Sequence, residues 1–156
     1  MTTVESASGG LYYEDWEIGK RYETRPRTVT LEDVARFGEI EGSKSPMHLD
    51  PEYAKQTVWG RMSLHGLLVL SVATGLMGES GLFNGTALAF LGLTWNFRDA
   101  VFVGDQVRVR WWVSEKRPTS KPGRGVVTRS IEVVNQDGVT CCTGTMSTLW
   151  SMRGVG

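Results

Sequence analysis

Residues 60–78, GRMSLHGLLVLSVATGLMG, contain the clearest helical pattern in the chain. Apolar residues recur three or four positions apart, which indicates a helix. Small residues lie between them on several sides, so we expect other backbone to pack closely around this helix. The apolar positions are Leu64, Leu67, Leu68, Val72 and Leu76, and the small ones are Gly66, Ser71, Ala73, Gly75 and Gly78.

After Gly81 the hydrophobic period changes to two, which is typical of strands. The alternation is clear in the first two of these segments and weaker in the third, and the last segment is rich in threonine and other strand formers. Residues 135–138 predict a hairpin turn, and residues 117–125, with two prolines and two glycines, a mobile loop. The expected strands are residues 91–97, 107–113, 127–133 and 139–150.

Before the central helix the pattern predicts one strand and two helices. Residues 22–29 favour a strand, at an edge because of Pro26. Thr30 followed by Asp33 resembles a capping box that begins a helix, and Asp50 with Pro51 begins a short one. The order predicts an α+β domain, helix on antiparallel sheet, over residues 11–156. Residues 1–10 are expected to be a disordered leader.

Composition excludes several classes of function. The 156-residue chain carries 17 basic and 17 acidic residues, so it has no net field for nucleic acid or an anionic membrane. No apolar run is long enough to span a membrane, and the N-terminus lacks the pattern of a secretory signal, so we expect a cytoplasmic protein. Cys141 and Cys142 are adjacent and therefore predict packing residues rather than a disulfide or a metal site. No cofactor is implied.

Two further groups of residues have alternative interpretations. The basic residues that gather in the C-terminal half are interpreted as solvated strand faces, with a local anion site as the alternative. The tryptophans are expected to pack in the core and at interfaces. The basic group is Arg108, Arg110, Lys116, Arg117, Lys121, Arg124 and Arg129, and the tryptophans are Trp59, Trp95, Trp111, Trp112 and Trp150.

Residues 37–54, FGEIEGSKSPMHLDPEYA, place His48 in a short Gly/Ser/Pro loop after a helix. This stretch resembles the hydratase signature of the MaoC-like dehydratase family, which includes R-specific enoyl-CoA hydratases. RMSLHGL at residues 61–67 is similar to a second family segment, and residues 11–19 and 97–109 resemble two others. The positions in register with the signature are Gly42, Pro46, Met47, His48, Asp50 and Ala54.

The resemblance implies the hot dog fold, an antiparallel sheet wrapped around a central helix, and a thioester ligand on CoA or an acyl carrier protein. It implies a hydro-lyase in which His48 is the base, tuned to neutral pH. The N–H of Gly66, at the start of the central helix, becomes the donor to the thioester oxyanion. Buried packing of the His48 loop is the alternative interpretation.

The chain departs from the family where the chemistry lies. Ser43 stands in place of the catalytic aspartate and Ser45 in place of an asparagine. A hydroxyl binds water but is not a base, so Ser43 or Glu41 is expected only to orient the water. Ser45, His65 and Glu41 are expected to contact the substrate. The alternatives are a locally hydrogen-bonded helix start for His65 and a solvated helix end for Glu41.

Two other functions remain open. Loss of the aspartate favours a non-catalytic subunit that binds acyl thioesters. A hot dog thioesterase needs a carboxylate on the central helix, and the first acid after Leu64 is Glu79. In either case the sheet leaves an edge that the family closes by pairing, so we expect a homodimer with the site at its interface.

Overall fold

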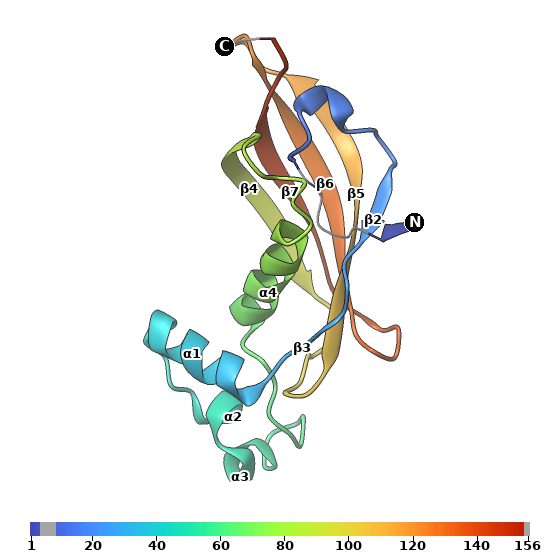
Figure 1. Cartoon of the computed structure of the whole chain (residues 1–156). Helices are drawn as coiled ribbons and strands as arrows, with labels where there is room; N and C mark the ends of the chain where they lie inside the picture. The colour runs from blue at the N-terminus through green and yellow to red at the C-terminus, as the bar shows by residue number, and fades with distance from the viewer. Residues whose placement is uncertain (4–8, 155–156) are drawn as a thin grey trace.

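The computed structural model describes residues 1–3 and 9–154. One sheet has the strand order β1-β2-β5-β6-β7-β4, with β3 also paired to β5 (Figure 1). All these pairs are antiparallel except β1 with β2. The strands are β1 (Thr2–Thr3), β2 (Arg21–Glu23), β3 (Arg27–Thr28), β4 (Ala87–Phe97), β5 (Gln106–Pro118), β6 (Arg124–Val134) and β7 (Thr140–Ser151).

The α-helices lie on one side of the sheet and at one end of it, whereas the 3-10 turn lies at the opposite end. The helix α4 packs across the sheet, whereas α1, α2 and α3 gather beyond the N-terminal end of α4 (Figure 1). The helices are the 3-10 turn η1 (Tyr13–Asp15), α1 (Leu31–Glu41), α2 (Pro46–Leu49), α3 (Pro51–Ala54) and α4 (Gly66–Gly78). The predicted central helix, the capping box at Thr30 and the N-cap at Asp50 are confirmed.

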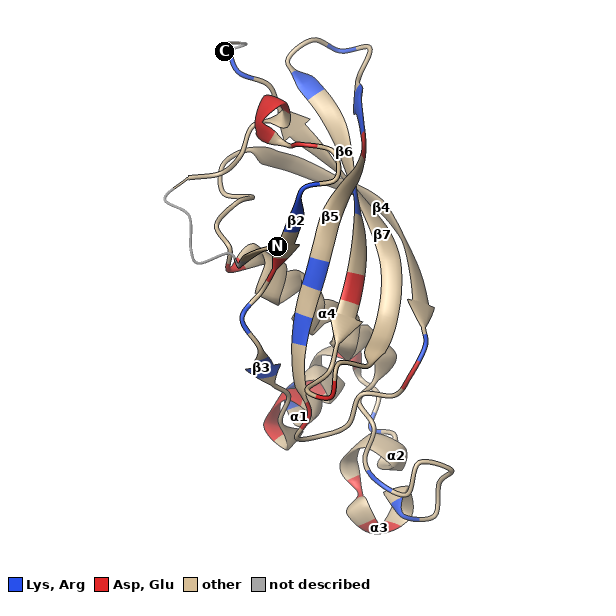
Figure 2. Ribbon diagram, turned by 90° about the vertical axis from the view of Figure 1, so that its right-hand side faces the viewer, with Lys and Arg blue, Asp and Glu red and all other residues tan. Residues whose placement is uncertain are grey.

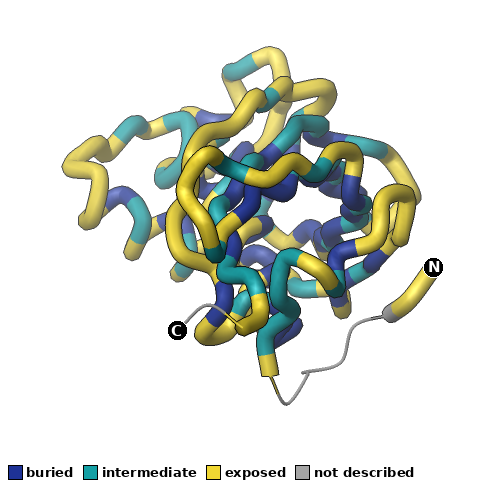
Figure 3. The backbone as a smooth tube through the Cα atoms, turned by 90° about the horizontal axis from the view of Figure 1, so that it is seen from above, coloured by how far each residue is buried: buried dark blue, intermediate teal, exposed yellow. Residues whose placement is uncertain are grey.

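The core lies between α4 and the concave face of β5, β6 and β7. Leu68, Val72 and Leu76 on α4 are buried, as the helical spacing predicts. Figure 3, seen from above, shows buried segments at the centre and exposed segments around them. The strand residues of this core include Val109, Trp111, Ile131, Met146 and Trp150. Both cysteines are free and buried, as predicted.

The structure differs from the sequence-based predictions in three segments: the first strand, the loop at residues 117–125 and the N-terminal leader. Pro26 has no N–H for a ladder, and the expected strand 22–29 divides there into β2 and β3. β5 and β6 extend into the expected loop at residues 117–125 and shorten it to residues 119–123; its mobility stays a prediction. The expected leader falls partly on residues 4–8, outside the described residues, while Thr2 and Thr3 pair with β2.

The edge strand β4 does not alternate between a buried and an exposed face as expected. Every residue of β4 except Trp95 is exposed. Its large apolar side chains, Leu88, Phe90, Leu91, Leu93 and Phe97, keep between 42% and 56% of their accessible surface. An exposed apolar edge of this length is one that proteins normally cover.

The basic residues of the sheet fall into two kinds. Arg108 and Arg110 on β5 lie on the outer face and bond Glu23 at 3.4 and 2.6 Å. Figure 2 shows basic bands on β5 and an acidic band on the neighbouring strand. Arg129 on β6 instead points to the core side and is 4% exposed, so its interpretation as a solvated strand residue is wrong.

In the described residues, helices of the length and hydropathy needed to cross a bilayer are absent.

Candidate active site

His48 lies on a one-turn helix, not in the loop that the sequence indicates. Ser45 is the N-cap of α2 and Pro46 its first residue, a position that suits proline because no N–H is required there. Asp50 then ends α2 and caps α3, accepting hydrogen bonds from the N–H groups of Glu52 and Tyr53. Two successive short helices therefore fix the backbone on both sides of His48.

The hydrogen bonds of His48 determine which ring nitrogen can act as a base. Its Nδ1 lies 2.6 Å from the carbonyl oxygen of Ser63. A carbonyl oxygen only accepts, so Nδ1 carries the proton and donates it. In the neutral ring Nε2 is then unprotonated, and within the described residues it has no hydrogen-bond partner. His48 thus presents a free lone pair.

His65 is held on both sides. Its Nδ1 accepts a hydrogen bond from the N–H of Leu67 at 3.2 Å, which caps α4. Its Nε2 lies 3.4 Å from the Glu41 carboxylate, and the Glu41 side chain keeps only 20% of its accessible surface. The two histidine rings stand edge to face, with centroids 5.5 Å apart. The Glu41 side chain therefore contacts the histidine cluster, while the residue as a whole remains exposed at the end of α1.

Two cavities meet at the histidines. The smaller, about 10 Å³, is about the smallest volume that holds one water molecule. The larger is about 480 Å³ and includes Gly66, Val69 and Phe97 in its lining. Five of the six residues singled out for the site, Glu41, Ser43, Ser45, His48 and His65, line the smaller cavity, and the sixth, Gly66, meets His48 and His65 at the larger one.

Gly66 combines an open backbone donor with close packing. It is the first residue of α4, and its N–H has no hydrogen-bond acceptor within the described residues, as is usual in a first helical turn. A Cβ at this position would lie 2.7 Å from Cζ of Phe97. Glycine therefore lets the Phe97 ring approach the helix start and leaves the N–H accessible from the cavity side.

Several residues of the larger cavity could not be assigned to the site from the sequence. Trp59, Arg98 and Asp99 line the larger cavity together with His48. They come from the segment before α4 and from the end of β4, and only the tertiary fold brings them together. Their one sequence signal is that Arg98 and Asp99 lie in the segment 97–109 that resembles the family. Asp99 places a carboxylate at this cavity even though residue 43 is a serine.

A carboxylate on the central helix is absent. α4 contains no Asp or Glu over its full described length. Glu79 caps the other end of the helix and pairs with Arg25 at 2.9 Å. The feature that a hot dog thioesterase would need is therefore missing from α4.

The sheet order, the enclosed helix and similarity to solved structures define the hot dog fold. A structure titled monoamine oxidase regulatory protein from Archaeoglobus fulgius superposes with a TM-score of 0.87 at 35% identity, covering 95% of this chain and 99% of that one.

The family model of the MaoC like domain matches residues 15–135, and the chain belongs to this family. It is 32% identical over 121 residues to a 3-hydroxybutyryl-CoA dehydratase of Methylorubrum extorquens, covering 78% of this chain and 75% of that protein. It is 32% identical over 128 residues to an (R)-specific enoyl-CoA hydratase of Aeromonas caviae, covering 82% and 90%. The family and these relatives support a hydratase or dehydratase of acyl thioesters.

Proposed function

We propose that this protein is a hydro-lyase that adds water to an enoyl thioester or removes it from a 3-hydroxyacyl thioester. One observation carries the proposal: the unpartnered Nε2 of His48 and the open N–H of Gly66 belong to residues of one cavity of about 480 Å³. A base and an oxyanion donor on the same cavity are the two groups that the reaction needs. The carrier is CoA or an acyl carrier protein.

In the hydration direction, the thioester oxygen accepts a hydrogen bond from the N–H of Gly66, strengthened by the positive end of the α4 dipole. His48 Nε2 takes a proton from water as the water oxygen bonds to C3 of the enoyl group. The electron pair of the double bond moves toward C2 and the carbonyl oxygen. C2 then takes the proton back from His48, which returns to its neutral form. Dehydration follows the same steps in reverse.

The small cavity supplies the water. Ser43, Ser45, Glu41 and His48 line it, and all four are polar residues. A bound water requires two to four polar partners, and these side chains provide them. Ser43 holds the water without accepting its proton, so the acid–base work rests with His48.

Glu41 acts on the reaction through His65. A carboxylate 3.4 Å from Nε2 favours the tautomer in which Nδ1 accepts from Leu67, and so fixes the ring beside His48. We assign Glu41 and His65 as positioning residues that also border the water. This role compensates in part for the missing aspartate.

One observation favours a second candidate function. Ser43 removes the family's carboxylate from the reaction centre, which leaves a cavity able to bind a thioester with reduced chemistry. Such a cavity suits a non-catalytic subunit that binds the thioester. Hydration would then occur only when this chain is mixed with a partner chain that supplies the aspartate. The two candidates differ in turnover, not in binding.

We also propose that the protein is a homodimer joined along β4. The strand exposes a row of apolar side chains and an unpaired edge over eleven residues. Pairing two copies through β4 would continue the sheet and remove that edge. Sedimentation velocity should give a dimer for the wild type and a monomer for Leu91→Lys, and a wild-type monomer at micromolar concentration contradicts the proposal.

The test of the function is incubation of the purified protein with crotonyl-CoA and longer 2-enoyl-CoA thioesters, with the product identified by mass spectrometry. We expect gain of one water molecule to give a 3-hydroxyacyl-CoA. Binding of the thioester without any product over this series would favour the second candidate. Release of free CoA from a saturated acyl-CoA would overturn both.

A further inference from the structure

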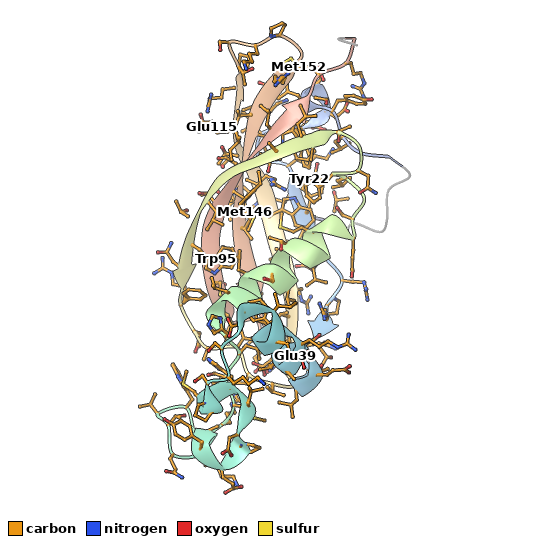
Figure 4. The ribbon with its side chains drawn as sticks, turned by 90° about the vertical axis from the view of Figure 1, so that its left-hand side faces the viewer. Tyr22, Glu39, Trp95, Glu115, Met146 and Met152 are labelled. Atoms are coloured by element: carbon orange, nitrogen blue, oxygen red, sulfur yellow. The ribbon has the colours of Figure 1, made fainter. Side chains whose placement is uncertain are left out.

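A third cavity, of about 410 Å³, lies at the C-terminal end of α4, away from the two at the histidines. It is bounded by α4, β4, β6 and β7, and its walls are mostly apolar. Figure 4 labels Met146, which lines it, and Trp95, which lies nearer to α1–α3. Its polar side chains come from three residues, Thr74, Arg129 and Thr148. Cavities with apolar walls and few polar groups at fixed positions are typical of small-molecule sites.

Arg129 is a buried cation without a counter-charge in the described residues. One guanidinium nitrogen, Nη2, donates to Oγ1 of Thr148 at 2.7 Å. Nε is buried and has no hydrogen-bond partner. Desolvation, with no neighbouring carboxylate, lowers the pKa of Arg129 to about 10. The outer-face arginines Arg108 and Arg110, by contrast, share the Glu23 carboxylate.

Aromatic rings cover the guanidinium but do not satisfy it. Its central carbon lies 4.8 Å from the ring centroid of Phe83 and 5.8 Å from that of Trp150. Ring faces attract a cation, yet they offer no acceptor to the Nε–H. A buried charge that lacks an acceptor destabilises the fold unless something else supplies one.

We propose that this cavity binds an alkyl carboxylate, with the carboxylate against Arg129 and Thr148 and the alkyl chain along the apolar walls between α4 and β4. A guanidinium forms two parallel hydrogen bonds to a carboxylate, which would satisfy Nε and a second nitrogen together. One guanidinium balances one negative charge, so a carboxylate fits better than a doubly charged phosphate. The apolar lining, including Met77, Phe90 and Met146, favours an alkyl chain.

The carboxylate has two possible sources. The two cavities lie along the same helix and the same strand: Gly66 and Cys142 line one, Met77 and Met146 the other. Gly66 and Met77 are about 16 Å apart along the axis of α4. The carboxylate is therefore either the far end of an acyl chain whose thioester lies at Gly66, which rests on the proposed function, or a separate fatty acid.

The test is calorimetric titration of the full chain with decanoate, and with decanol as the uncharged probe. We expect decanoate to bind the wild type and to bind Arg129→Met at least tenfold more weakly, with Arg129→Lys between them. Arg117→Met, which removes an exposed arginine of β5, should bind as the wild type does. Decanol should not distinguish wild type from Arg129→Met. Equal decanoate affinity in wild type and Arg129→Met, or no decanoate binding to the wild type, overturns the proposal.

A second arm identifies the source. Turnover of an enoyl-CoA that carries a terminal carboxylate is compared with that of the unsubstituted chain of equal length. A preference for the carboxylated substrate that Arg129→Met removes identifies the substrate's own end, and decanoate binding without such a preference identifies a separate fatty acid. The titration needs no turnover, so its outcome is independent of whether the proposed hydration occurs.

Discussion

The polar side chains at the two ends of α4 differ in how fully they are hydrogen-bonded. At the N-terminal end, His48 and His65 each have one ring nitrogen hydrogen-bonded to backbone, and a carboxylate lies beside His65. At the C-terminal end, Arg129 stands buried with a single hydrogen bond among apolar side chains. The first end is preorganised, so a change there should alter rate more than stability. The second end carries an unsatisfied charge, so a change there should alter stability and ligand affinity.

The largest effect is expected at Ser43, in the preorganised end. Ser43→Asp should raise the rate of crotonyl-CoA hydration by about 10²–10⁴, because it adds a positioned acid–base group beside His48. Stopped-flow measurement of kcat/KM tests this. The control is Gln56→Asp, which adds the same single negative charge at an exposed residue just after α3. An unchanged rate in Ser43→Asp would mean that the small cavity does not hold the reacting water.

The second effect concerns the buried cation. Arg129→Met should raise the free energy of unfolding by about 1–3 kcal/mol in the absence of ligand, because it removes an uncompensated buried charge and keeps an apolar chain of similar length. Urea denaturation of wild type, Arg129→Met and Arg117→Met measures it. A loss of stability in Arg129→Met would show that the rings of Phe83 and Trp150 already compensate the charge.

A smaller effect is expected from the carboxylate beside His65. Glu41→Gln should lower kcat by roughly fivefold, since it removes a carboxylate charge that lies 3.4 Å from His65 Nε2 and contributes about 1 kcal/mol to holding the ring. Glu39→Gln is the matched control, because the same change is made on the same helix at an exposed residue (Figure 4). Equal rates in Glu41→Gln and wild type would assign Glu41 no part in the site.

The smallest effect tests the paired arginines of the outer face. Burial opposes ionisation of Glu23, but hydrogen bonds from Arg110 and Arg108 outweigh it and lower its pKa below the ordinary value of 4.5. The stabilisation is therefore complete above pH 4.5 and lost as the pH falls through the lowered value. Glu23→Gln should cost about 0.5 kcal/mol near pH 7 and less at pH 3. A difference independent of pH would contradict this pairing.

Local sequence rules predict most of the fold correctly. The spacing in α4, the alternation in β5 and the caps at Thr30 and Asp50 depend on residues close in the chain. The exposure of β4 could not be predicted in this way, because its alternating pattern is the same whether the opposite face meets a core or a partner.

The sequence names candidate residues for the site but not their arrangement, and their roles stay predictions. The histidines, the two serines and Glu41 could be singled out from their spacing and from the resemblance. The contact of Glu41 with His65 depends on how α1 packs against the start of α4. Arg129 had one local signal, since it occupies an inward position between Val127 and Ile131, but only the tertiary structure shows that it lacks a carboxylate partner among the described residues.

The most direct measurement is the initial rate of crotonyl-CoA hydration, followed by loss of enoyl absorbance, for wild type and His48→Ala. We expect turnover by the wild type and a loss of about 10²–10⁴ in the rate of His48→Ala, with crotonyl-CoA affinity retained. The melting temperature should fall modestly, because the buried Ser63 carbonyl loses its partner. Equal rates in the two proteins, or a wild type that binds crotonyl-CoA without hydrating it, would contradict the assignment of His48 as the base of an active hydro-lyase.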